Sequence, residues 1–166
     1  DTNVSGVLDI YRFTVSNVFV AGHRSAALDK VGNGYDLRAV YIGVIINPIA
    51  SGCGIGYSMK QMAGRTTGVN GVPFTGGEVQ SCDKAAYLHD VANCGFYGTI
   101  FESSGATAYA GVHLAGDCTG IGFYQTYCEG NKGYDFKCNL AGGGQPNRNI
   151  TFEGVTVRAN TAGGGN

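Results

Sequence analysis

The chain has 166 residues, of which 43% are hydrophobic and 14% are charged, and its formal net charge is -1. This composition favours a folded domain over a disordered chain, and the balanced charge argues against a nucleic-acid partner. The longest apolar stretch, "AVYIGVIINPIASG", is too short to span a bilayer and contains Pro48, so we expect no membrane insertion. Frequent glycine together with β-branched and aromatic residues predicts many short strands joined by tight turns.

The first two strand-like stretches repeat one another at an interval of 30 residues. They read "YRFTVSNVFVAG" (11–22) and "YIGVIINPIASG" (41–52), and they share a tyrosine, an asparagine and a glycine at equivalent places. Residues 63–74 follow as the largest candidate insertion. Repetition of this kind predicts successive copies of one structural unit.

Four later segments each begin with a phenylalanine, at intervals of 22, 27 and 29 residues: Phe74, Phe96, Phe123 and Phe152. Five places after each phenylalanine the residue is apolar. Six places after it the residue is polar: Gln80, Glu102, Glu129 and Arg158. Eight places after it the residue is small or polar: Cys82, Ser104, Asn131 and Asn160. Each position in the unit therefore keeps its chemistry from copy to copy.

A second short strand pattern lies between these segments, at 85–90, 110–116 and 134–139. Alternation of side chains along a strand divides its residues between two faces. One face is apolar: Leu88, Val112, Leu114, Phe136 and Cys138. The other is polar or aromatic: Tyr87, His89, His113, Asp135 and Lys137.

Units of 22–30 residues, with two or three short strands each and no helical period, fit the coils of a parallel β-solenoid. Stacked coils lie about 4.8 Å apart, so equivalent residues form columns. A β-sandwich is the alternative, but it would not preserve chemistry position by position. We expect one domain over residues 1–166, and we expect it to be a section of a longer protein because neither end resembles a cap.

The six cysteines show no CxxC spacing, and a chain of this length does not need disulfide staples. We therefore expect reduced thiols and folding in a reducing cytoplasm. Ligand types do not cluster at zinc spacing either, so the sequence predicts no metal and no cofactor.

The stretches "AAYLHDVANCGFYGTIFESS" and "AGVHLAGDCTGIGFYQTYCEGN" resemble coils of the right-handed parallel β-helices of bacteriophage tailspikes, with the corner "YCEGN" (127–131) as the most similar part. Pectate-lyase-like enzymes and adhesins share that architecture. The resemblance implies an all-β, right-handed parallel β-helix, here with about six coils. It also implies a homotrimer on the virion tail that contacts phage tail or baseplate proteins and binds or cleaves bacterial capsule or O-antigen polysaccharide. A secreted protein is the alternative location.

Glu102 and Glu129 are the first catalytic candidates, because hydrolysis of a glycosidic bond uses two carboxyl groups. Adjacent coils would hold them about 4.8 Å apart, near the separation that suits retention of configuration. Their mutual repulsion would raise the pKa of one of them, as an acid catalyst requires. A structural ladder is the alternative, because Gln80 and Arg158 share the column and Arg158 can pair with Glu129.

Histidine and aspartate side chains form a second group of catalytic candidates: His89, Asp90, His113 and Asp117. We expect the two histidines at similar places one coil apart, where an imidazole can act as acid or base. For a lyase acting on a uronic acid, a histidine or tyrosine base and a cation such as Lys137 would serve. Plain surface exposure is the alternative.

The candidates for carbohydrate binding are Tyr87, Tyr97 and Tyr124, with Asp135 and Lys137 as polar partners. A ring with a polar tip suits the face of a sugar. Tyr97 and Tyr124 each follow a core phenylalanine and should point outward. The leading hypothesis is thus a tailspike depolymerase that acts as an endo-glycosidase, with a polysaccharide lyase as an alternative. The competing one is a non-catalytic β-helical shaft or carbohydrate-binding fibre module.

Overall fold

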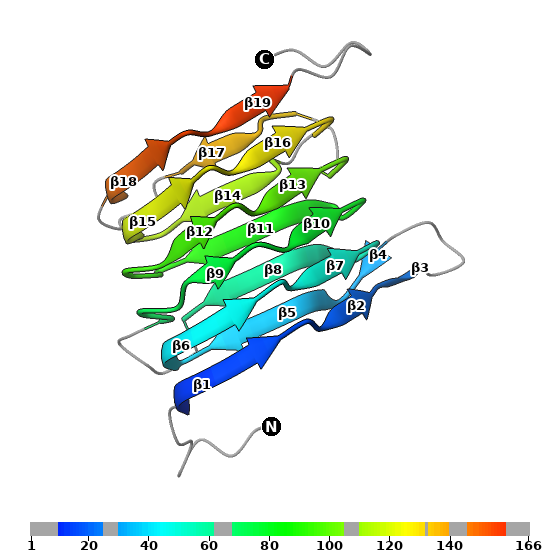
Figure 1. The fold of residues 1–166 in the computed structure, drawn as a ribbon. Helices are drawn as coiled ribbons and strands as arrows, with labels where there is room; N and C mark the ends of the chain where they lie inside the picture. The colour runs from blue at the N-terminus through cyan, green and yellow to red at the C-terminus, as the bar shows by residue number, and fades with distance from the viewer. Residues whose placement is uncertain are drawn as a thin grey trace.

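The computed structural model describes residues 10–24, 30–61, 68–104, 110–131, 133–139 and 146–158. These residues form strands, turns and bends, with no helix among them. Three parallel sheets run the length of the molecule, and each successive strand of a sheet comes from the next pass of the chain (Figure 1). The all-β solenoid fold predicted from the repeat is therefore confirmed.

The first sheet holds six strands: β1 (Ile10–Ser16), β6 (Val40–Ile46), β9 (Phe74–Thr75), β12 (Gly95–Tyr97), β15 (Thr119–Tyr124) and β18 (Arg148–Glu153). The second also holds six: β2 (Phe19–Ala21), β7 (Ile49–Ser51), β10 (Glu78–Gln80), β13 (Ile100–Glu102), β16 (Tyr127–Glu129) and β19 (Thr156–Arg158). The third holds five: β5 (Asn33–Arg38), β8 (Ile55–Lys60), β11 (Lys84–His89), β14 (Val112–Ala115) and β17 (Phe136–Cys138). A short antiparallel pair, β3 (His23–Arg24) and β4 (Lys30–Val31), interrupts the first coil.

The chain visits the first, second and third sheets in turn. It crosses the near side from left to right and returns behind as it rises toward the C-terminus, which makes the coil right-handed (Figure 1). Fewer than six coils are complete, because the last pass contributes β18 and β19 but no strand of the third sheet among the described residues.

Residues predicted to share a column pair in register. Phe96 pairs with both Phe74 and Phe123, and Phe123 pairs with Phe152. Their rings stack inside the solenoid, with centroids 5.2 Å apart and planes 6° apart for Phe96 and Phe123. The Tyr57 ring packs against the Phe74 ring, with centroids 5.0 Å apart, and the Tyr57 hydroxyl donates a hydrogen bond to the backbone oxygen of Pro48. Apolar burial of this column stabilises the coil-on-coil stacking.

Two predicted core residues are exposed, contrary to expectation. Phe152 is 49% exposed, and Cys138 also lies at the surface. Both belong to the last strands of their sheets, so no described strand covers them. Cys94, Cys118 and Cys128, by contrast, are buried thiols. Burial raises the pKa of the Cys94 and Cys128 thiols to about 12.

Polar side chains at the corners form hydrogen bonds between adjacent coils. Asn131 accepts from the Ser104 backbone N–H at 3.1 Å and donates to the Phe101 carbonyl at 3.0 Å. Ser104 in turn accepts from the backbone N–H of Cys82 at 3.2 Å. These hydrogen bonds pair buried backbone N–H and C=O groups at the corners, where the hydrogen bonding between strands is interrupted. Asn160, expected in the same column, lies outside the described residues.

Candidate functional site

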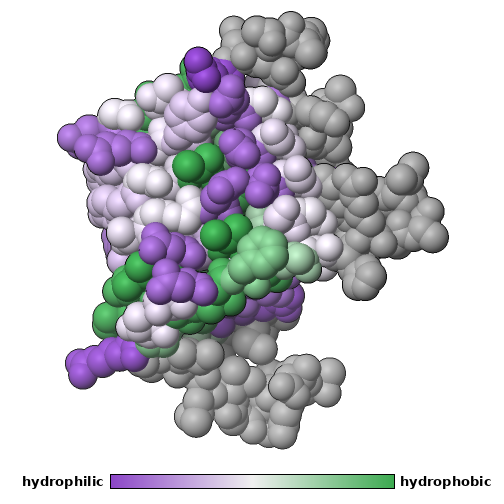
Figure 2. Space-filling model, turned by 45° about the vertical axis from the view of Figure 1, so that its right-hand side comes forward, coloured by the Kyte–Doolittle hydropathy of each residue, from purple (hydrophilic) through white to green (hydrophobic). Residues whose placement is uncertain are grey.

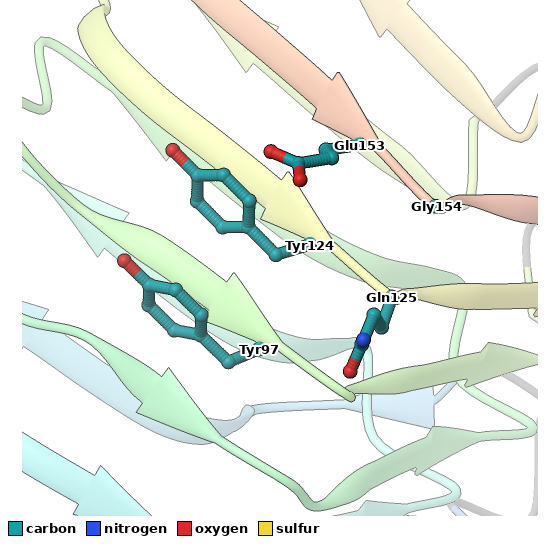
Figure 3. Close-up of a pocket in the computed structure, with 5 residues that line it drawn as sticks. All are labelled: Tyr97, Tyr124, Gln125, Glu153 and Gly154. Atoms are coloured by element: carbon teal, nitrogen blue, oxygen red, sulfur yellow. The ribbon is translucent and has the colours of Figure 1, made fainter.

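Tyr97 and Tyr124 stand side by side on the outer face of the first sheet (Figure 3). Their ring centroids are 4.8 Å apart and their planes differ by 10°, so the rings form an offset stack. Tyr97 is 44% exposed. The outward placement predicted for both tyrosines is therefore correct.

Two glycines give these rings their position. A Cβ on Gly122 would lie 2.2 Å from Cε2 of Tyr124, and a Cβ on Gly95 would lie 2.6 Å from the corresponding atom of Tyr97. Each ring thus lies back over the glycine two places before it. Any side chain at Gly95 or Gly122 would push the ring away from the sheet.

A cavity of about 350 Å³ adjoins the two rings, and Gln125, Glu153 and Gly154 complete its lining (Figure 3). An aromatic surface beside an amide and a carboxylate can both contact the face of a sugar and bind its hydroxyl groups. Gln125 and Glu153 were not predicted as binding residues. The sequence offered one indication, because Gln125 directly follows Tyr124 and replaces the glycine found at that corner in neighbouring coils.

Glu102 and Glu129 pair in register on adjacent strands of the second sheet, as predicted. The outer face of this sheet carries hydrophilic side chains between apolar ones (Figure 2). Glu129 accepts a hydrogen bond from the Tyr127 hydroxyl, and its Oε1 lies 3.5 Å from Nη1 of Arg158. The pairing expected between Arg158 and Glu129 is thus present, although Arg158 is well exposed and such pairs contribute little stability.

The two glutamates have different environments. Burial, and then the charges of Glu78 and Glu129, raise the pKa of the Glu102 carboxyl. Glu78 lies two places before Gln80 on β10, and sequence reasoning missed it because it falls outside the aligned column. Glu102 therefore holds its proton more tightly than an ordinary glutamate, whereas Glu129 has a phenol donor and a guanidinium beside it. Such asymmetry is what an acid and a partner carboxylate need.

The tyrosine cavity and the glutamates lie on neighbouring sheets joined by a short corner. Gln125 and Thr126 connect Tyr124 to Tyr127, and Thr126 is buried, so Gln125 forms the surface of the corner. From the rise of about 3.3 Å per residue, Tyr124 and Glu129 are on the order of 15 Å apart along the chain. An oligosaccharide of several rings can contact both.

The two histidines are not in register, which corrects the expectation. His113 pairs with Tyr87, and His89 pairs with Ala115. Pairing in the third sheet sets Leu88 against Leu114 in the core, and burial of that leucine pair fixes the register.

Asp90 and Asp117 are held by structural contacts. The two carboxylate oxygens of Asp90 lie 2.8 Å from Nδ1 of His89 and 2.8 Å from the backbone nitrogen of Asp117. The Asp117 carboxylate accepts two hydrogen bonds from Arg148, at 3.0 and 3.1 Å. Both aspartates line a second cavity of about 330 Å³ with Gln61 and other residues. The structure brings His89, Asp90 and Asp117 together, whereas His113 lies on the neighbouring strand against Tyr87 and is not among the residues that line this cavity.

The remaining predicted residues occupy other places. Tyr87 lies on the third sheet, so it does not join Tyr97 and Tyr124. Lys137 pairs with His113 in that sheet. The Asp135 carboxylate accepts from Nδ2 of Asn131 at 2.9 Å, so this carboxylate supports a corner.

In the described part of the chain, no three His, Cys, Asp or Glu side chains gather as metal ligands would. That part also holds no apolar helix of membrane-spanning length. No protein-family model matches the chain, and comparison with curated proteins and with solved structures gives no match either. Inference about function therefore depends on the geometry of the surface.

Proposed function

We propose that this chain binds a polysaccharide across the outer faces of the first and second sheets. The observation that carries the proposal is the exposed Tyr97–Tyr124 stack beside a cavity lined by Gln125 and Glu153. Stacked rings offer an apolar face to a sugar, and the amide and carboxylate next to them accept or donate hydrogen bonds to hydroxyls. The preformed stack also lowers the entropy lost on binding.

Hydrolysis of the bound glycan is the second part of the proposal, and the environments of Glu102 and Glu129 favour it. Glu102 donates its proton to the glycosidic oxygen as the leaving group departs. Glu129 attacks the anomeric carbon, and its one-coil separation from Glu102 suits a covalent intermediate. Water, deprotonated by Glu102, then releases the sugar with retention of configuration.

A purely structural role for the glutamates is the competing explanation. Arg158, Glu129 and Tyr127 form a small network, which a non-catalytic shaft could also use. Binding at the tyrosine stack would persist in that case, and cleavage would not occur.

The tailspike resemblance supplies the setting for this activity. It favours capsule or O-antigen as the polysaccharide, a place on the virion tail, and assembly as a homotrimer. Exposed apolar side chains on the first two coils fit a contact between copies: Val18, Phe19, Ile42 and Val44.

A glycan array of bacterial surface polysaccharides tests binding directly. We expect the protein to bind a subset of glycans and Tyr124→Ala to lose that binding, while Tyr134→Ala, which removes another exposed tyrosine, keeps it. Incubation with the best ligand, followed by assay of reducing ends, tests cleavage. No binding to any array glycan, or equal binding by Tyr124→Ala, contradicts the proposed site.

A further inference from the structure

Glu153 differs from the other acidic residues in the described part of the chain, because its carboxylate has no hydrogen-bond or ion-pair partner there. The other described acids each interact with a neighbouring group: Asp36, Glu78, Asp83, Asp90, Glu102, Asp117, Glu129 and Asp135. An ionised carboxylate has several acceptor positions. Those of Glu153 are therefore open to a ligand.

This free carboxylate belongs to the cavity at the tyrosine stack. Glu153 on β18 is the register partner of Tyr124 on β15, so both side chains project from the outer face of the first sheet. Figure 3 shows the carboxylate on the side of Tyr124 away from Tyr97. The cavity of about 350 Å³ is lined by both rings, Gln125 and this carboxylate. A bound group can therefore contact the carboxylate and an aromatic ring together.

The arginines on the two last strands do not neutralise Glu153. Arg148, at the other end of β18, donates to both carboxylate oxygens of Asp117, at 3.0 and 3.1 Å. Arg158 on β19 lies 3.5 Å from Glu129, measured from Nη1 to Oε1. The faces of tyrosine rings carry negative electrostatic potential as well. The cavity thus combines one formal negative charge with the negative faces of aromatic rings.

Such a cavity favours a positively charged group. An ammonium ion over an aromatic ring gains about 0.5–1 kcal/mol at an exposed site. An ammonium N–H also forms a charge-assisted hydrogen bond to a carboxylate, and the amide oxygen of Gln125 offers a further acceptor. A sugar acid would instead bring a second negative charge next to Glu153 and be repelled.

We propose that this cavity binds an ammonium group carried by the glycan, with Glu153 as its counter-ion and Tyr124 as its aromatic partner. The group can be the free amine of an amino sugar or the quaternary ammonium of a choline substituent, because both carry the same charge. This inference rests on the proposed function and names the class of glycan. The sugar at the tyrosine stack is cationic, not neutral or acidic.

NMR of isotope-labelled tyrosine side chains measures this binding, with Tyr124→Phe used to assign the Tyr124 resonance. Glucosamine and choline are the two charged probes, and glucose is the neutral control. The titrations are run at about pH 6, where the amine of glucosamine is protonated. We expect a saturable shift of the Tyr124 resonance with at least one charged probe, at an affinity about tenfold above that for glucose. Tighter binding of glucosamine points to an amino sugar, and tighter binding of choline points to a choline substituent.

Glu153→Gln should lower the affinity for the charged probe about tenfold and leave that for glucose unchanged, because it removes only the charge. Asp83→Asn, which removes a negative charge between β10 and β11, should leave both affinities unchanged. Added salt should weaken binding of the charged probe alone. Circular dichroism confirms that the variants fold.

Equal affinity for glucose and both charged probes overturns the inference, as does unchanged affinity for the charged probe in Glu153→Gln. No response of Tyr124 to either charged probe overturns it too. Failure of the proposed function has a different signature, because the glycan array would then show no binding that depends on Tyr124.

Discussion

Gly122→Ala should disable the tyrosine stack without altering any residue that touches the ligand. The added Cβ would lie 2.2 Å from Cε2 of Tyr124, so the ring must leave its place over the strand. Gly122 has no positive φ, and alanine therefore fits the backbone of β15. The variant loses the stacking of Tyr124 on Tyr97, which contributes about 0.5–1.5 kcal/mol, and the displaced Tyr124 ring no longer contacts the sugar in the same place. We expect affinity for the array-selected oligosaccharide to fall about tenfold, equivalent to about 1.4 kcal/mol.

Isothermal titration calorimetry measures the affinity, and urea unfolding measures stability. Stability should change by less than about 1 kcal/mol, because the reduced freedom of the unfolded chain offsets the lost stacking. A double variant, Gly122→Ala with Tyr124→Ala, provides the control. If the glycine acts through the ring, this double variant binds no more weakly than Tyr124→Ala alone. Unchanged affinity in Gly122→Ala, or additive losses in the double variant, would refute the role assigned to the stack.

Three further predictions concern the glutamates and the core. Glu102→Gln should lower cleavage by about 10²–10⁴-fold in a reducing-end assay, and Asp117→Asn should leave it unchanged because Asp117 is bound by Arg148. A raised pKa means that folded Glu102 binds its proton more tightly than the unfolded chain does, so its ionisation costs stability as the pH rises above about 4.5. Glu102→Gln should thus be more stable than the parent near neutral pH and equally stable below that window, in thermal melts across pH. Phe123→Ala should cost about 3–5 kcal/mol in urea unfolding, since its fully buried ring contacts both neighbours in the stack. A loss below 1 kcal/mol would contradict that packing.

The sequence contains enough information to predict the coil stacking and the glutamate column. The same residue types follow Phe96 and Phe123 at the same distances along the sequence. Aligning these two phenylalanines therefore also aligns Glu102 with Glu129. The intervals between equivalent residues differ only because the turns differ in length. The strands keep their register because a shift of one residue would expose their buried face.

Register in the third sheet was harder to predict. The segments of His89 and His113 look alike, but the leucine pair in the core decides the pairing and shifts His89 away from His113. A residue's exposure also depends on where the stack ends, which periodicity does not show, and Phe152 is the example. The cavity is lined by residues from adjacent coils, since Gln125 follows Tyr124 in one coil and Glu153 pairs with Tyr124 from the next, a geometry that no single repeat displays.

A crystal structure of the protein with an array-selected oligosaccharide tests the central claim most directly. The account predicts a sugar ring in contact with Tyr124, with hydroxyl groups within hydrogen-bond distance of Gln125 or Glu153, and the glycan extending toward Glu129. A glycan bound elsewhere, with the tyrosine stack left open to solvent, would contradict it.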